Sequence, residues 1–381
     1  MKILCSFILC TVLLSCKSEK KMKQKTVETN PKTTKDQTFY VGTYTQKESK
    51  GIYKYSLSDT GVLKKIGLVA STENPSFLAL SHDQKSLIAV NEIAEENGGF
   101  VSSYAIKNDR LIFMNKALSG GDNPCFVGIS KNGNVLVANY SSGTVGLLKL
   151  EEGGTLSELL AIQQHTGKGI TERQEAPHAH SVWFEKNSEQ KIIAVDLGSN
   201  ELWFSEIDTS ANSFLPATQK LAMAAGAGPR HLAFHPNENN MYVLNELDNT
   251  ITLVKKIKGM YANTSTISTV PHDFSGFSKS ADIHVSKDGK FLYASNRGHD
   301  SLAIFSIHPN DGSLQLVGFE RTKIKTPRNF SLSPDNKFLL VANQDADTII
   351  AFSRDSNTGL LRFVSEIQAP TPVCILFTAQ S

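Results

Sequence analysis

The feature that most constrains the fold is a phrase that recurs seven times along the chain. Each copy starts with Pro or Ser, continues with alternating apolar residues, makes a polar turn, and ends in an apolar run that closes on a polar residue. The copies begin at residues 75, 124, 177, 229, 280, 327 and 372, so their spacing is 45 to 53 residues. This period suits a four-stranded propeller blade and is too long for a helix-pair repeat.

Each copy has the pattern of a β-hairpin followed by two more strands. Turn-forming residues stand between two β-rich runs, as in Pro-Asp-Asn at residues 334–336 and Asp-Gly at residues 288–289. A second alternating run follows, for example at residues 250–254, 301–305 and 348–352. A helical period of 3.6 residues is nowhere sustained, so the sequence predicts an all-β fold.

The last copy is incomplete and predicts how the ring closes. It stops after one strand, near residue 377, which would leave a blade with an unpaired edge. Residues 39–44 match the second-strand phrase at residues 338–343, and residues 51–55 match the third strand. We therefore predict a seven-bladed β-propeller in which residues 39–44 pair beside residues 372–377.

The first 37 residues predict export and tethering. An apolar run at residues 3–14 follows Lys2 and is far shorter than the ~20 residues of a spanning helix, as in a secretory signal. It ends in Leu-Leu-Ser-Cys, which resembles a bacterial lipobox, so we expect removal of residues 1–15 and lipid attachment at Cys16. An ordinary signal peptide with an incidental Cys is the alternative. Residues 16–37 then form a flexible stalk, and residues 38–381 form a propeller domain anchored to the envelope, at the periplasm or the cell surface.

Charge and cysteine content narrow the partners. Residues 17–37 hold seven Lys against three acidic residues and so carry a net charge of +4, to which Lys2 adds +1. Because the whole chain has a net charge of +2, residues 38–381 carry a net charge of −3. This slightly acidic body has no electrostatic footprint for nucleic acid, and we expect a monomer. Cys125 and Cys374 lie in copies that are not neighbours, so we expect no disulfide between them.

Antiparallel pairing predicts where functional groups gather. The residues that open the first strand of a blade and those that close the second lie on the same face of the ring. The residues selected in this way are Asn91, Glu92, Asn139, Tyr140, His178, His180, Asp196, Arg230, His231, Asn245, Glu246, Asn296, Arg297, His299, Arg328, Asn329, Asn343 and Gln344. So many ionisable groups at one mouth of the channel indicate a binding or catalytic site.

Several of these residues have an alternative structural role. An Asn that closes a strand, such as Asn343, also suits a tight turn. A guanidinium does not stabilise a tight turn, so the selected arginines, Arg230, Arg297 and Arg328, are more consistent with anion binding. His178 and His180 could be core histidines or zinc ligands, but no Cys or carboxylate stands at ligand spacing, so we predict no metal and no cofactor. The long polar loop at residues 163–176 is either a lid or a neutral insertion.

At these residues the sequence resembles the lactonase family of seven-bladed propellers, the type that includes 6-phosphogluconolactonase and carboxy-cis,cis-muconate cyclase. The matching motifs include Gly-Lys-Gly at residues 167–169, Arg-Gln at 173–174, Pro-His-Ala-His at 177–180, Gly-Pro-Arg-His at 228–231, Leu-Asn-Glu at 244–246, Ser-Asn-Arg-Gly-His at 295–299 and Pro-Arg-Asn-Phe at 327–330. The likeness covers about residues 38–378. It implies a lactone site at the channel mouth made by His180, Arg230, Glu246 and Arg297.

The chemistry of these four residues agrees with lactone hydrolysis. Hydrolysis needs a base to activate water and cations to stabilise the charge on the carbonyl oxygen. Either His180 or Glu246 could be the base, and the two arginines would hold the oxyanion and the anionic substrate. Further substrate contacts are expected from His178, His231, Arg328, Asn343, Asp196 and Arg173. We expect hydrolysis of a small anionic lactone, such as a sugar lactone.

Three alternatives remain at this point. An exported chain would not meet the cytoplasmic 6-phosphogluconolactone, so another sugar lactone or carboxylated lactone is equally compatible. The chemistry could also be of the muconate-lactone cyclase type. Finally, Leu-Val-Ala-Asn at residues 136–139 resembles the repeats of surface-layer propellers, which would bind a protein or glycan without catalysis. A scaffold repeats the same turn residues in every blade, whereas only the third to fifth copies carry His180, Arg230 with Glu246, and Arg297, which favours an enzyme.

Overall fold

The computed structural model describes residues 36–381, except residues 97, 109, 237–239 and 380–381. The predicted signal peptide, the predicted lipid site Cys16 and nearly all of the predicted stalk lie outside the described residues. Within the described part, no helix has the length and apolar character needed to cross a bilayer.

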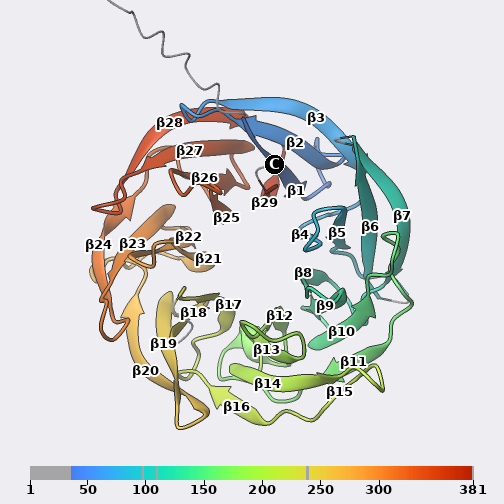
Figure 1. Ribbon diagram of the computed structural model, residues 1–381. Coiled ribbons are helices and arrows are strands. Elements are labelled where there is room, and N and C mark those ends of the chain that lie inside the picture. The colour runs from blue at the N-terminus through green and yellow to red at the C-terminus, as the bar shows by residue number, and fades with distance from the viewer. Residues whose placement is uncertain (1–35, 97, 109, 237–239, 380–381) are drawn as a thin grey trace, which may run out of the picture. The chain divides into compact units, whose positions relative to one another are not determined.

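Seven antiparallel sheets stand in a ring around a central axis, as predicted (Figure 1). We number the blades 1 to 7 and give their strands from the axis outward. They are β4 (Leu78–Leu80), β5 (Ser86–Asn91), β6 (Phe100–Lys107) and β7 (Arg110–Leu118); β8 (Pro124–Ile129), β9 (Asn134–Asn139), β10 (Thr144–Lys149) and β11 (Ala161–Gln164); β12 (Ala179–Phe184), β13 (Lys191–Asp196) and β14 (Glu201–Asp208), with β15 (Ser213–Phe214) and β16 (Gln219–Ala222) both paired to β14; β17 (Pro229–Phe234), β18 (Asn240–Asn245), β19 (Thr250–Ile257) and β20 (Met260–Ser268); β21 (Lys279–Val285), β22 (Phe291–Arg297), β23 (Ser301–Ile307) and β24 (Leu314–Glu320); β25 (Pro327–Leu332), β26 (Phe338–Asn343), β27 (Thr348–Arg354) and β28 (Leu361–Gln368); and β29 (Pro372–Phe377), β1 (Gln37–Thr43), β2 (Gly51–Leu57) and β3 (Leu63–Ser71).

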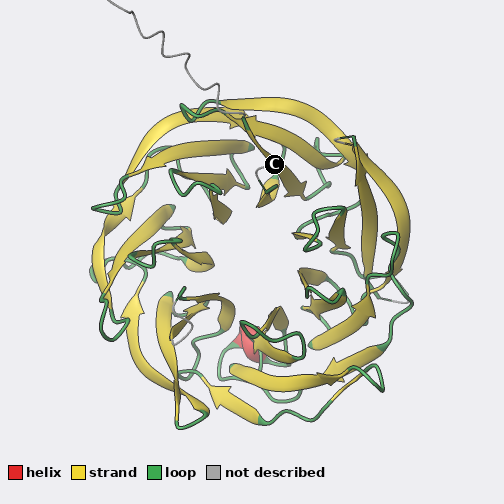
Figure 2. Ribbon diagram, in the orientation of Figure 1, coloured by secondary structure: helices red, strands yellow, loops and turns green. Residues whose placement is uncertain are grey.

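Two details differ from a plain four-stranded repeat. Blade 3 has a fifth short strand, because β15 and β16 share the outer edge of β14. The helical element among the described residues is a single 3-10 turn, η1 (Glu172–Gln174), in the long loop between blades 2 and 3 (Figure 2).

Burial explains the apolar pattern of each blade. The second strands β5, β9, β18 and β26 are buried at every position, whereas the outer strand β3 is mostly exposed. Both faces of an inner strand pack on neighbouring blades, so the middle of the strand is a continuous apolar run rather than an alternating one. The core accordingly lies between blades, as where Phe126 and Leu136 of blade 2 pack with Val182 and Trp203 of blade 3.

Buried tyrosines join neighbouring blades. The Tyr242 hydroxyl of blade 4 donates to the Gly312 carbonyl of blade 5 at 2.8 Å, and the Tyr293 hydroxyl of blade 5 donates to the Gly359 carbonyl of blade 6 at 2.8 Å. Each such bond stabilises the fold by about 1 kcal/mol, and losing it would leave a buried polar group unpaired. These two hydrogen bonds therefore help to fix the spacing of blades 4, 5 and 6.

The ring closes as the sequence predicts. Strand β1 pairs with β29 in antiparallel register, with Phe39 opposite Phe377 and Tyr40 opposite Leu376. Blade 7 thus contains both ends of the described chain, and no open edge is left at the junction. Cys125 and Cys374 are buried free thiols, which confirms that they are not paired with each other.

Candidate active site

A β-bulge near the start of the innermost strand re-aims one residue in each of several blades. The register with the second strand shifts between Pro124 and Phe126, and equivalent shifts occur at the same place in blades 3, 4 and 6. The bulged residues are Cys125, His180, Arg230 and Arg328. A bulge turns a side chain out of the regular alternation. It therefore explains how four blades place polar groups together at the axis.

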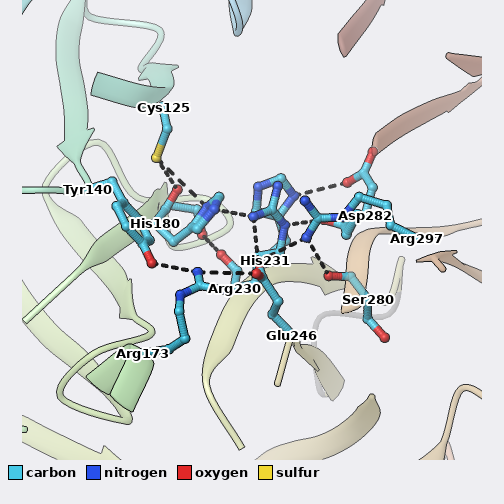
Figure 3. Close-up of polar contacts among 12 residues, drawn as sticks. Cys125, Tyr140, Arg173, His180, Arg230, His231, Glu246, Ser280, Asp282 and Arg297 are labelled. Atoms are coloured by element: carbon cyan, nitrogen blue, oxygen red, sulfur yellow. Dashed lines mark hydrogen bonds and ion pairs between the residues drawn. The ribbon is translucent and has the colours of Figure 1, made fainter. Parts of the chain in front are cut away.

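Glu246 is the centre of this cluster (Figure 3). It follows β18, and its side chain is only 3% exposed. Its Oε2 atom accepts from Arg230 Nη1 at 2.7 Å and lies 3.2 Å from Arg297 Nη2. Its Oε1 atom accepts from Arg173 Nη2 at 3.4 Å. Three arginines from three different segments thus converge on one buried carboxylate.

These charges decide the protonation state of Glu246. Burial alone would raise the pKa of the carboxyl group, but the charges of Arg297, Arg230 and Arg173 outweigh burial and lower this pKa to about 2. Glu246 is therefore ionised at neutral pH, and it is a weak base.

His180 contacts the same cluster through Arg230. The Nη1 atom of Arg230 hydrogen-bonds His180 Nε2, and the Nδ1 atom of His180 lies 3.8 Å from Cys125 Sγ. A guanidinium can only donate, so Nε2 of His180 is the acceptor and its ring is neutral in this arrangement. Burial, together with the charge of Arg230, lowers the pKa of His180 well below its usual value.

The long loop between blades 2 and 3 reaches over the cluster. Arg173 in η1 donates to the Tyr140 hydroxyl at 2.7 Å as well as to Glu246. Its neighbour Gln174 is fully buried and donates to the Leu197 carbonyl at 2.8 Å, which fixes the loop. His178 stacks on the Tyr140 ring at 4.5 Å. We therefore place this loop, with Arg173, at the rim of the site.

A second pair of charges faces the cluster from blades 7, 1 and 6. The Tyr44 hydroxyl donates to both Glu92 carboxylate oxygens at 2.9 Å, and the Arg328 guanidinium lies 5.1 Å from the centre of the Tyr44 ring. This guanidinium donates no hydrogen bond to another described residue, and it lines a small cavity with Cys125 and Arg230. Arg328 therefore has donors available for a ligand.

Two of the predicted substrate contacts, Asp196 and Asn343, do not join the cluster. Asp196 accepts from His165 Nδ1 at 2.7 Å and from the backbone of His178 and Ser199, so both its oxygens are used locally. Asn343 bonds Lys323, Lys325 and Thr348 and holds its turn, in line with its alternative structural role.

The structure adds residues that were not selected by their position at the strand ends. Tyr44 and Cys125 border the site, and Asp282 hydrogen-bonds His231. The sequence does hold a signal for Cys125. In three copies the residue directly after the opening proline is the bulged residue, and these residues are Cys125, Arg230 and Arg328.

The arrangement suits an anionic substrate. Four arginines (Arg173, Arg230, Arg297 and Arg328) face two glutamates (Glu92 and Glu246), which leaves a surplus of positive charge. Across the described part of the chain, no group of three or more His, Cys, Asp or Glu side chains is placed to hold a metal ion.

Fold and site together define a seven-bladed propeller with a buried, arginine-rich polar site at the axis. The family described as "Lactonase, 7-bladed beta-propeller" matches residues 38–377. The chain belongs to this lactonase family, as its sequence motifs indicated.

Named relatives and a solved structure agree. The chain is 37% identical to a 6-phosphogluconolactonase of Bacillus subtilis over 296 residues, which cover 76% of this chain and 83% of that protein. It is 34% identical to a 6-phosphogluconolactonase of Formosa agariphila, covering 77% of this chain and 85% of that one. It also matches the structure of the Pseudomonas aeruginosa periplasmic gluconolactonase with a TM-score of 0.85 and 29% identity, covering 91% of this chain and 99% of that one.

Proposed function

We propose that this protein hydrolyses a small anionic lactone of the sugar-lactone type at the propeller axis. The observation that carries the proposal is the convergence of Arg173, Arg230 and Arg297 on the buried Glu246. The names of the relatives and of the structural neighbour support a lactone substrate.

The four residues suggested by the family resemblance have distinct chemical uses here. Arg230 and Arg297 supply positive charge where the carbonyl oxygen becomes an oxyanion, and such preorganised charge is a large term in catalysis. Glu246 holds both guanidinium groups in place. His180 accepts a hydrogen bond from Arg230 and so helps to orient its guanidinium.

The available donors of Arg328 indicate where a negative group of the substrate would bind. A guanidinium binds a carboxylate or phosphate through two parallel hydrogen bonds. Arg328 and Arg230 border the same small cavity, so a lactone with its carbonyl near Arg230 would place an acidic substituent near Arg328.

We also propose that the chain is exported and lipid-anchored through Cys16, with residues 16–37 as the stalk and residues 38–381 as a monomeric catalytic domain. The lipobox-like sequence supports this, and the periplasmic neighbour supports export. An exported enzyme would not meet a phosphorylated cytoplasmic lactone, which favours a carboxylated sugar lactone as the anionic substrate.

A panel of lactones tests the proposed activity. The full chain is assayed by proton release with phosphorylated and unphosphorylated aldonolactones and with a simple aliphatic lactone. We expect hydrolysis well above the spontaneous rate for at least one acidic or sugar lactone. Rates equal to the spontaneous rate for every lactone would overturn the proposal and favour the binding module.

An arginine pair at opposite ends of the propeller provides the matched test. Arg297→Lys keeps the charge but loses the planar fork, so kcat/KM should fall at least about tenfold while the melting temperature changes little. Arg354→Lys is the control, because Arg354 is also buried and pairs with Asp288 at 2.7 Å, but at the hairpin end away from the site. Equal activity of both variants would contradict the assigned role of Arg297.

A further inference from the structure

His231 is the third histidine near the axis, and it has a different set of partners from His180. Its Nδ1 atom lies 3.0 Å from Asp282 Oδ1, and both side chains are about 95% buried. Asp282 is itself held on every side, by His284 Nε2 at 3.0 Å, Asn329 Nδ2 at 2.6 Å and the Phe330 amide at 3.2 Å. The carboxylate is therefore a rigid acceptor (Figure 3).

This contact fixes the tautomer of His231. A carboxylate accepts hydrogen bonds, so the proton of the neutral ring lies on Nδ1 and the lone pair lies on Nε2. The Nε2 atom is buried and has no hydrogen-bond partner among the described residues. A buried acceptor without a partner destabilises the fold, and a bound water that donates to Nε2 would remove this cost.

The other two candidate bases are occupied. The lone pair of His180 Nε2 already accepts from Arg230. Glu246 is surrounded by three arginines and holds its proton only under strongly acidic conditions. His231 is thus the histidine near the axis whose basic nitrogen is available.

His231 borders a small cavity of about 10 Å³, together with Cys125, Arg230, Arg328 and Asn329. This volume holds about one water molecule, the reactant that a base would activate. The aromatic rings of Phe77 and Phe126 stand edge-on to His231 at 6.1 and 5.8 Å and separate it from bulk water.

We propose that His231, oriented by Asp282, is the base that deprotonates the water attacking the lactone. This inference rests on the proposed lactonase function. In it, His231 is the catalytic residue and Asp282 is a positioning residue.

The step balances as a simple hydrolysis. His231 Nε2 takes one proton from water while the water oxygen bonds to the carbonyl carbon, and the carbonyl electron pair moves to the oxygen that Arg230 and Arg297 stabilise. When the pair returns, the ring C–O bond breaks, and the leaving alkoxide takes the proton from His231. The product is a hydroxy acid, which releases one proton to solvent as it ionises.

The pH dependence has a defined sign. The charged and titratable groups that face His231 are Arg230 on its own strand, His180 on β12, Asp282 and His284 on β21, with Cys125 and Arg328 across the cavity. Burial lowers the pKa of His231 below 6.5, although the hydrogen bond to Asp282 opposes this shift. The base form therefore predominates at pH 7, and kcat/KM should fall only as the pH drops below about 6.5.

The test compares three variants of the full chain on the best lactone. His231→Gln should lower kcat by about 10²- to 10⁴-fold and remove the acid limb of the kcat/KM profile. Asp282→Asn should lower kcat more than tenfold, with KM nearly unchanged, and should shift the acid limb. His165→Gln is the matched control, because His165 makes the same kind of buried contact, with Asp196 at 2.7 Å, but does not line the cavity. It should lose stability and keep the wild-type profile.

Each outcome decides between the claims. A His231→Gln variant that keeps wild-type kcat/KM and its acid limb overturns the inference but leaves the lactonase function standing. A wild-type protein that hydrolyses no lactone overturns the proposed function itself. If His231 variants do not fold, ¹⁵N NMR of the wild type with bound hydroxy acid decides. A change at His231 Nε2 on product binding supports the inference, and no change overturns it.

Discussion

Replacing Glu246 by Gln should destabilise the protein strongly at neutral pH. The substitution keeps the side-chain size but removes the one negative charge that Arg230, Arg297 and Arg173 share. Arg230 is only 4% exposed, so its charge would be left buried without an anionic partner. Breaking a buried ion pair in this way costs about 3–5 kcal/mol.

The effect should depend on pH with a defined sign. The folded-state pKa of Glu246 is lowered to about 2, so its stabilisation is present above the unfolded pKa and is lost as the pH falls toward 2. From an unfolded value near 4.3, the gap between wild type and Glu246→Gln should narrow by about 1 kcal/mol between pH 5 and pH 3.5. Urea unfolding at pH 7, 5 and 3.5 measures this gap.

A surface carboxylate provides the control. Glu206 lies 3.8 Å from Lys191, and its side chain is 37% exposed, so Glu206→Gln should leave the free energy of unfolding nearly unchanged. A loss below about 1 kcal/mol for Glu246→Gln, or a gap that does not vary with pH, would refute the reasoning.

Three further predictions follow from local contacts. Asn343→Ala should cost about 1–3 kcal/mol of stability, because it leaves buried turn groups unpaired, and it should spare the turnover of folded protein, as thermal melts and lactone assays would show. Arg173→Ala should raise KM with little change in melting temperature, since Arg173 stands at the half-exposed rim; an unchanged KM would exclude it from substrate binding. Thiol titration of the denatured, unreduced chain should count Cys125 and Cys374 as free, and a count in which neither reacts would contradict this.

Much of the fold could be predicted from the sequence because every blade of a propeller repeats the same strand pattern. The spacing of the copies predicted seven blades, and the match between residues 39–44 and the second-strand phrase predicted the closure that β1 and β29 make. The extra strand β15 was not predicted, because a two-residue pairing leaves no period in the sequence.

The candidate site was predicted in part. The rule that strand ends share a face brought Arg230, Glu246 and Arg297 together, and these three do meet. The rule failed for Asp196, which also closes a second strand, because its oxygens accept hydrogen bonds from its own turn and from His165.

Asp282 shows what the periodic pattern could not reveal. It lies inside the first strand of blade 5, where the register shifts between Ser280 and Ile283. A bulge of this kind depends on tertiary packing, so alternation alone does not assign the side chain to the axis. Its contact with His231 joins blades 4 and 5 through two residues that are 51 positions apart in the sequence.

The location of a bound reaction product tests the central claim most directly. A crystal structure of the full chain with an aldonate, the hydroxy acid that lactone hydrolysis yields, measures this location. We expect the aldonate carboxylate within hydrogen-bond distance of Arg230 or Arg297, beside the Glu246 cluster. An aldonate bound anywhere else, with the Glu246 cluster left untouched, would contradict the account.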